Sequence, residues 1–253
     1  MYLVRYEKDL AVQYGYLEGE TIGSVTGDIF GDFIRGGPVA HLGEVTLLPP
    51  VTPSKIIAVT HNFAGRLREA GLPRPDLPPL RLKAPNALIG AGETVRLPAT
   101  AQDVQPGACL AVVIGQRGRQ ISPDEADRHI LGFTCANDLA AVDVADLDGS
   151  WTRAVSFDTF LPLGPAIATH IDPVELVISG SVNGVTRQLA STHDMLFTVP
   201  QVVAFVSAAM TLDPGDLILM GAPEGEQALA AGDVLEVSIE SIGVLRNPVI
   251  AEP

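Results

Sequence analysis

The sequence is poor in cysteine and has no long apolar run. Its two cysteines, Cys109 and Cys135, form no Cys-x-x-Cys pair and no disulfide framework, which indicates a reducing compartment. The start of the chain carries Arg5 and Glu7, so the apolar region of a secretory signal does not fit there. No apolar stretch reaches the length of a membrane span. We therefore expect a soluble, cytoplasmic protein.

Basic residues are also scarce. The chain has 16 lysines and arginines against 30 aspartates and glutamates, which gives a formal net charge of −14. This balance disfavours nucleic acids and anionic membranes as partners, because their phosphates would be repelled. It leaves room for a small anionic organic acid, since a single pocket can differ in charge from the whole surface.

What is present indicates a packed, mainly β or α+β protein. The chain has 253 residues, 47% of them hydrophobic, which is enough for one core with a small appendage. Short apolar stretches alternate with Gly and Pro turns, and the few predicted helices are short. This pattern predicts many strands and does not fit a doubly wound parallel sheet.

The prolines of "LLPPVTPSK" indicate a domain boundary near residues 47–55. We predict a small β-rich N-terminal domain at residues 1–48 and a larger domain at 53–253. In the first, "DIFGDFIRGG" has the pattern of a short helix that ends at Gly36 and Gly37. In the second, Asn183-Gly184 predicts a hairpin turn, and "TVPQVVAFVSAAM" has helical apolar spacing.

A series of motifs resembles the fumarylacetoacetate hydrolase superfamily, in the family's order and over roughly residues 53 to 250. The resemblance implies a mixed, strongly curved β-sandwich roll, usually in a dimer, and the first 48 residues resemble the small N-terminal domain of many members. The motifs are "PSKIIAVTHNF", "NALIGAGETVRLP", "LAVVIG", "GFTCANDLA", "SFDTFLPLGP", "VNGVTRQ", "STHDMLF" and "TLDPGDLILMGAPEG".

The metal ligands of the family are mostly missing. The resemblance implies Mg²⁺ or Mn²⁺ held by a Glu-x-Glu before "LAVVIG" and by the Asp of an "AND" motif. Here the two Glu positions are Gly107 and Cys109, and only Asp138 remains. One carboxylate is a poor site for a hard dication, and a thiol does not suit it. We therefore expect no metal cofactor at this position.

Other functional positions have changed too. The family's His-x-x-Glu pair, which activates water, aligns with Arg66 and Glu69. Three further positions of the family site, usually Arg, Lys and Thr, are Val142, Val155 and Ala222. A metal-dependent hydrolase mechanism is therefore not supported. The chain is similar to the N-terminal half of the bifunctional isomerase/decarboxylase of 4-hydroxyphenylacetate breakdown, in which one half lacks the acidic metal set.

Six residues remain as candidates for a site. The resemblance implies catalytic roles for Glu69, Lys83 and Asp138, and substrate binding by His61, Arg66 and Gln188.

Each candidate also has a structural interpretation that needs no function. Arg66 and Glu69 are spaced as an ordinary surface pair on a helix. His61 would then be a structural residue whose hydrogen bonds are satisfied, and Lys83 would be a surface lysine. Asp138 would be a loop residue that caps backbone N–H groups. Cys109 fits a small buried hydrophobe.

Two functions stay open. By family, the chain is an enzyme: an isomerase/decarboxylase of the 2-hydroxyhepta-2,4-dienedioate isomerase type, or a subunit of one, acting on a 2-oxo or 2-hydroxydienoic acid in aromatic catabolism. Alternatively, it is a catalytically silent member that binds a small acid or supports an active paralogue. Either function is compatible with a homodimer or with a heteromer that contains such a paralogue.

Overall fold

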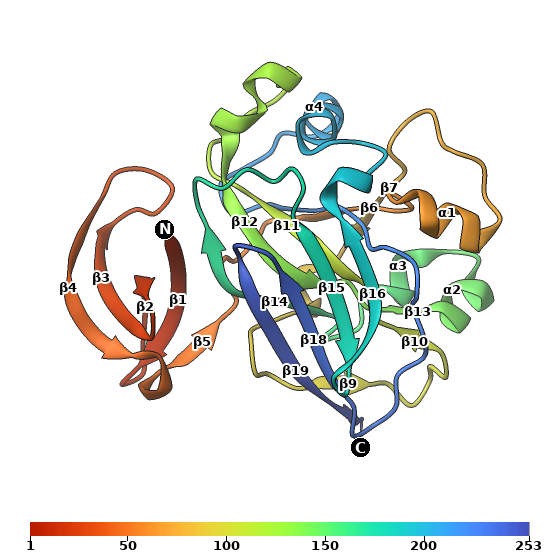
Figure 1. Ribbon diagram of the computed structural model, residues 1–253, viewed down its shortest axis with the longest axis horizontal. Coiled ribbons are helices and arrows are strands. Elements are labelled where there is room, and N and C mark those ends of the chain that lie inside the picture. Colours follow the sequence, from red (N-terminus) through yellow and green to blue (C-terminus); the bar gives the residue numbers. More distant parts are fainter. Residues whose placement is uncertain (253) are drawn as a thin grey trace.

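The computed structural model describes residues 1–252, so Pro253, the last residue of the predicted second domain, lies outside the described residues. The N-terminal strands form an antiparallel meander in the order β4-β3-β2-β1, with β5 against β1 (Figure 1). Val4, Tyr6 and Ile22 form its small core. The strands are β1 (Tyr2–Lys8), β2 (Ala11–Glu18), β3 (Thr21–Gly27), β4 (Phe33–His41) and β5 (Thr46–Leu48).

The helix predicted over "DIFGDFIRGG" is wrong, because Phe33–His41 is strand β4, paired with β3. The glycines that had suggested a helix end, Gly36 and Gly37, therefore lie within an extended strand.

The meander continues into the main sheet, because β1 pairs with β14. From there the order is β14-β12-β11-β17-β6-β7. A second sheet, in the order β16-β15-β18-β19-β9, packs on it. The strands are β6 (Ile56–Val59), β7 (Leu80–Lys83), β8 (Leu88–Ile89), β9 (Val95–Leu97), β10 (Val104–Gln105), β11 (Ala108–Ile114), β12 (Ile130–Asn137), β13 (Ala140–Ala141), β14 (Leu161–Ala168), β15 (Val177–Val182), β16 (Val185–Ser191), β17 (Leu217–Leu219), β18 (Val234–Ile239) and β19 (Gly243–Ala251).

Strand β11 runs through the centre of the protein, and all seven of its residues are buried. Because side chains alternate along a strand, Leu110 and Val112 pack with residues of the second sheet, while Cys109 and Ala111 enter the core on the other face. The apolar "LAVVIG" run therefore suits a strand covered on both sides. The predicted mixed β-sandwich is confirmed.

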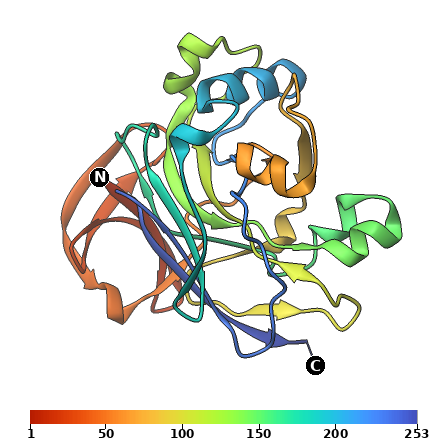
Figure 2. The same cartoon turned by 45° about the vertical axis from the view of Figure 1, so that its right-hand side comes forward.

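The helices are short, as predicted. α4 begins after Thr198, which forms a capping box with Gln201, and it buries Val202, Val203 and Val206 on the core. The hairpin turn at Asn183-Gly184 is confirmed, with φ of 53° and 75°. Helix α2 packs against α3 and β10, and α3 also contacts β7; the two helices project together at one side of the protein (green in Figure 2). The helices are α1 (Ala64–Ala70), α2 (Val142–Asp148), α3 (Trp151–Ala154) and α4 (Val199–Ala209).

No helix within residues 1–252 is both long enough and apolar enough to cross a membrane.

A buried carboxylate fixes the parallel pair β6 and β17. Asp216 is fully buried and accepts hydrogen bonds from the Ser54 hydroxyl at 2.7 Å, the Lys55 amide at 3.1 Å and the Asp213 amide at 2.7 Å. The Lys55 ammonium lies 2.5 Å from its second oxygen. These bonds join the segment that enters β6 to the turn that enters β17, and β6 leads directly into the site described below.

We expect Asp216→Ala to lower the free energy of unfolding by about 3 kcal/mol or more, because it leaves buried donors and Lys55 without their partner. Asp213→Ala is the matched control. It removes the half-exposed second partner of Lys55 and should cost less than about 1 kcal/mol. Urea denaturation of both variants measures the difference, and equal losses would contradict the role given to Asp216.

Candidate functional site

A cleft of about 570 Å³ opens between α1, β7 and α2, and six ionisable side chains line it: His61, Arg66, Arg81, Asp138, Asp146 and Glu226. A larger hollow of about 810 Å³ lies elsewhere, but its lining is mainly apolar and brings together no comparable group of charges. Convergent ionisable groups in a concave site mark the smaller cleft as the candidate.

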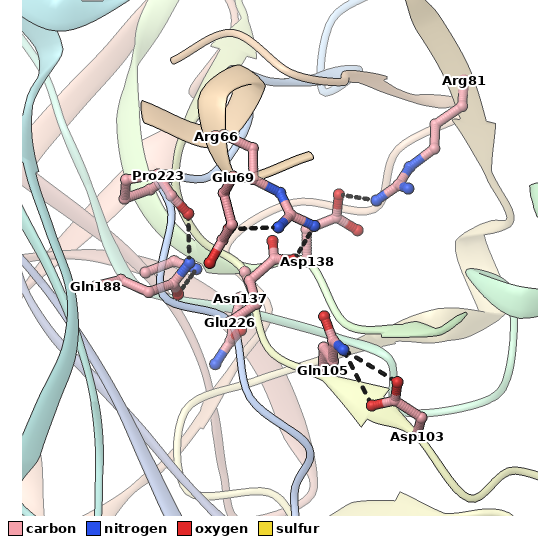
Figure 3. Close-up of polar contacts among 12 residues, drawn as sticks. Arg66, Glu69, Arg81, Asp103, Gln105, Asn137, Asp138, Gln188, Pro223 and Glu226 are labelled. Carbon is pink, nitrogen blue, oxygen red and sulfur yellow. Dashed lines mark hydrogen bonds and ion pairs between the residues drawn. The ribbon is translucent and has the colours of Figure 1, made fainter. Parts of the chain in front are cut away.

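At the base of the cleft, Asp138 is held by two cations of the same strand. Lys83 Nζ lies 2.8 Å from Asp138 Oδ1, and Arg81 lies 2.7 Å from Oδ2 (Figure 3 shows the second contact). Arg81 and Lys83 are two residues apart on β7, so both side chains leave the same face. The Lys83 side chain is fully buried and also donates to the Leu139 carbonyl at 2.8 Å.

The pair is ionised at neutral pH. Burial raises the pKa of Asp138, but the charges and hydrogen bonds of Arg81 and Lys83 outweigh it and bring the pKa to about 2. Burial lowers the pKa of Lys83 to about 8, against the opposing effect of Asp138. Lys83 was expected near the pocket or on the surface, and it lies beneath the pocket as a buried, paired ammonium.

The residues around Asp138 do not fit a hard dication. Gly107 supplies no carboxylate, and a Cβ atom there would lie 2.9 Å from the Asp138 carbonyl oxygen and 3.2 Å from the Ala222 Cβ. Cys109 is buried, and its sulfur is a soft ligand that does not suit a hard dication. Both oxygens of Asp138 already bind protein cations. Residues 1–252 hold no group of three or more His, Cys, Asp or Glu arranged for a metal ion.

On the α1 side of the cleft, Arg66 bridges two glutamates. One of its terminal nitrogens lies 2.6 Å from Glu69 and the other 2.5 Å from Glu226 (Figure 3 shows this cluster). The pair expected between Arg66 and Glu69 is confirmed as a contact, but the Glu69 side chain is 43% exposed. Glu226 is 15% exposed, and burial raises its pKa to about 7 although Arg66 and Arg81 act against the rise.

His61 borders the cleft at the end of β6, in a left-handed backbone conformation with φ of 56°. Burial lowers the pKa of its imidazole, and Arg66 and Arg81 lower it further, so the ring is neutral at pH 7.

The neighbour of His61, Asn62, is fully buried and ties this turn to other loops. Its side-chain amide donates to the Met220 carbonyl at 2.9 Å and accepts from the Phe197 amide at 2.9 Å. These bonds fix the turn after β6 against the end of β17, and thereby the side of the cleft from which Glu226 comes.

Gln188 is not brought to the cleft. Its side-chain oxygen accepts from the Ala108 amide at 2.9 Å, and its nitrogen donates to the Pro223 carbonyl at 2.8 Å (Figure 3). With both ends bonded to backbone, Gln188 joins β16, β11 and the loop after β17.

Sequence reasoning missed Arg81, Trp151 and Glu226. Trp151 covers the Arg81 guanidinium at 5.2 Å from the ring centre. The sequence could have indicated Arg81, because it stands two residues before Lys83 and so lies on the same face of the strand. No sequence pattern indicates Glu226, because it lies in the irregular loop between β17 and β18.

Comparison with known proteins identifies the family. Residues 55–250 match the family described as fumarylacetoacetate (FAA) hydrolase C-terminal, and residues 1–50 match an Rv2993c-like N-terminal family. The chain belongs to the fumarylacetoacetate hydrolase family.

Relatives within this hydrolase family come from all three domains of life. An uncharacterised protein of Archaeoglobus fulgidus is 47% identical over 209 residues, 83% of this chain and 84% of its own. The mitochondrial oxaloacetate tautomerase FAHD2A of Bos taurus is 38% identical over 226 residues, 84% of this chain and 72% of its own. The structure of 2-hydroxyhepta-2,4-diene-1,7-dioate isomerase from Mycobacterium marinum matches with a TM-score of 0.93 at 37% identity, covering 100% of this chain and 99% of that one.

We expect Lys83→Met to lower the free energy of unfolding by about 3 kcal/mol or more, because Asp138 stays buried with one of its two cations lost. Arg81→Met removes the more exposed cation and should cost clearly less. Chemical denaturation at pH 7 measures both. If Lys83→Met cost no more than Arg81→Met, Lys83 would not be the main buried partner of Asp138.

Proposed function

We propose that this chain is an isomerase or tautomerase that moves a proton within a small 2-oxo or 2-hydroxydienoic acid and needs no divalent cation to do so. The observation that carries the proposal is the pair of protein cations, Lys83 and Arg81, bound to the one family carboxylate that remains.

The charge of the cleft suits an anionic substrate. Arg66 and Arg81 line it from α1 and β7, and guanidinium groups bind carboxylates by charge-assisted hydrogen bonds. Arg81 Nε is buried without a hydrogen-bond partner in residues 1–252, so the group has a donor that an acidic ligand would satisfy after a small shift.

The reaction class follows from what the cleft supplies. Moving a proton next to a 2-oxo group passes through an enolate, whose negative charge must be stabilised. A metal ion does this as a Lewis acid. Here fixed cations would do it, with the Arg81 guanidinium at the cleft surface and the Lys83 ammonium beneath it. Hydrolysis would need an activated water, and Arg66 occupies the position of the family histidine.

The named relatives support the same class. One is an oxaloacetate tautomerase and another a 2-hydroxyhepta-2,4-diene-1,7-dioate isomerase. Both names describe the shift of a proton and a double bond in a dicarboxylic acid. The proposal for this chain covers that step alone and does not extend to decarboxylation.

The alternative is a chain that binds such acids without converting them, beside an active paralogue in a heteromer. The same two cations favour binding in either case. Turnover by the purified chain alone separates the two.

We expect the EDTA-treated protein to convert enol-oxaloacetate to its keto form, or to isomerise a 2-hydroxydienedioate, at the rate of the untreated protein. Arg81→Met should lower kcat/KM by about 100-fold or more through the lost charge-assisted hydrogen bonds. Absorbance of the enol or dienol measures both rates. Loss of activity with EDTA and recovery with Mn²⁺ would overturn the metal-independent mechanism, and an inactive pure protein that still binds oxalate would favour the alternative.

A further inference from the structure

We propose that Glu226, oriented by Arg66, is the group that transfers the proton in this cleft and takes the place of the family's His–Glu pair. The inference rests on the proposed function, because it names the acid–base residue of that reaction. Arg66 stands where the family carries its histidine, and its guanidinium reaches across the cleft to a carboxylate from a different loop.

The geometry leaves one oxygen of Glu226 available. Arg66 binds Oε2, and Oε1 makes no hydrogen bond to any residue in the described range 1–252. Glu226 lines the cleft together with Arg81 and Asp138. Its free oxygen is thus in the same cavity as the cations proposed to hold the substrate, as a proton carrier must be.

The groups around Glu226 come from several elements. Arg66 and Glu69 lie on α1, Arg81 lies on β7, and Asp138 follows β12, and all four influence its charge. Burial has the largest effect and raises its pKa to about 7. A group that titrates near the working pH exchanges protons in both directions most readily. Glu224, on the same loop, packs instead over Gly65.

The other acids of the cleft are less suited. Asp138 has a pKa of about 2 and both of its oxygens are bound, so at neutral pH it is a poor proton acceptor. Glu69 is the more exposed partner of Arg66. Asp146 is an exposed residue of α2. His61, with its neutral ring, is the remaining competitor, and its substitution belongs in the test.

The first experiment measures kcat and KM from about pH 5 to about pH 9 for the wild type, Glu226→Gln, Glu224→Gln and His61→Asn. We expect Glu226→Gln to lower kcat by about 100-fold or more with little change in KM. Glu224→Gln should leave both unchanged, which shows that the loop still folds. A Glu226→Gln enzyme with wild-type kcat, or a loss confined to His61→Asn, would overturn the proposal.

Arg66 is a positioning residue, so its test is a pH profile. Since its charge lowers the pKa of Glu226, Arg66→Met should raise that pKa. The carboxylate then forms only at higher pH, and the acidic limb of the kcat profile should move upward from about pH 7. If the acidic limb of the kcat profile did not move, Arg66 would not set the pKa of Glu226.

Calorimetry with oxalate separates this inference from the proposed function. A dianion bound beside Glu226 disfavours its ionised form, so binding near pH 7 should take up a proton, seen as a heat that depends on the buffer. Proton uptake that disappears in Glu226→Gln supports the assignment even if the pure protein proves inactive. Uptake that persists in Glu226→Gln overturns it even if the protein is an active isomerase.

Discussion

The ion pairs of Asp138 with Lys83 and Arg81 are the interaction on which the site depends. They connect β7, at the edge of the main sheet, to the end of β12 near its centre. A carboxylate this deeply buried is tolerated only with partners of opposite charge. Two fixed cations provide them, so the cleft is assembled and electrically balanced by the chain's own residues. The same cations place positive charge at the cleft, although the protein as a whole is strongly acidic.

A second ion pair lies on the α1 side of the cleft. Arg66 of α1 binds Glu226, which comes from the loop after β17. The His–Glu pair implied by the family lies within one helix, whereas this pair joins a helix to a distant loop. Protein cations therefore bind carboxylates on both sides of the cleft, Asp138 at its base and Glu226 beside α1.

Much of the fold could be read from the sequence, because its signals are local. Asn183-Gly184 determines a hairpin, the capping box at Thr198 begins α4, and the continuous apolar run of β11 marks a strand covered on both faces. The helix expected near Gly36 failed because Phe33–His41 pairs with β3, a tertiary contact that no local pattern records. In the site, Lys83 and Asp138 could be located from motifs, but their pairing could not. The role of Glu226 could not be predicted, because its position depends on a loop whose path is fixed by hydrogen bonds to Asn62 and Gln188.

The close approach at Gly107 bears on which residues this site can accept. Its Cα faces the Asp138 carbonyl so tightly that even one added carbon would have to displace backbone. A glutamate at this position would therefore require the β12 end to move, and the new acid would then compete with Asp138 for Lys83. The glycine thus keeps a second carboxylate out of the space beside Asp138 by sterics, and it leaves the two cations of β7 as the partners of that carboxylate.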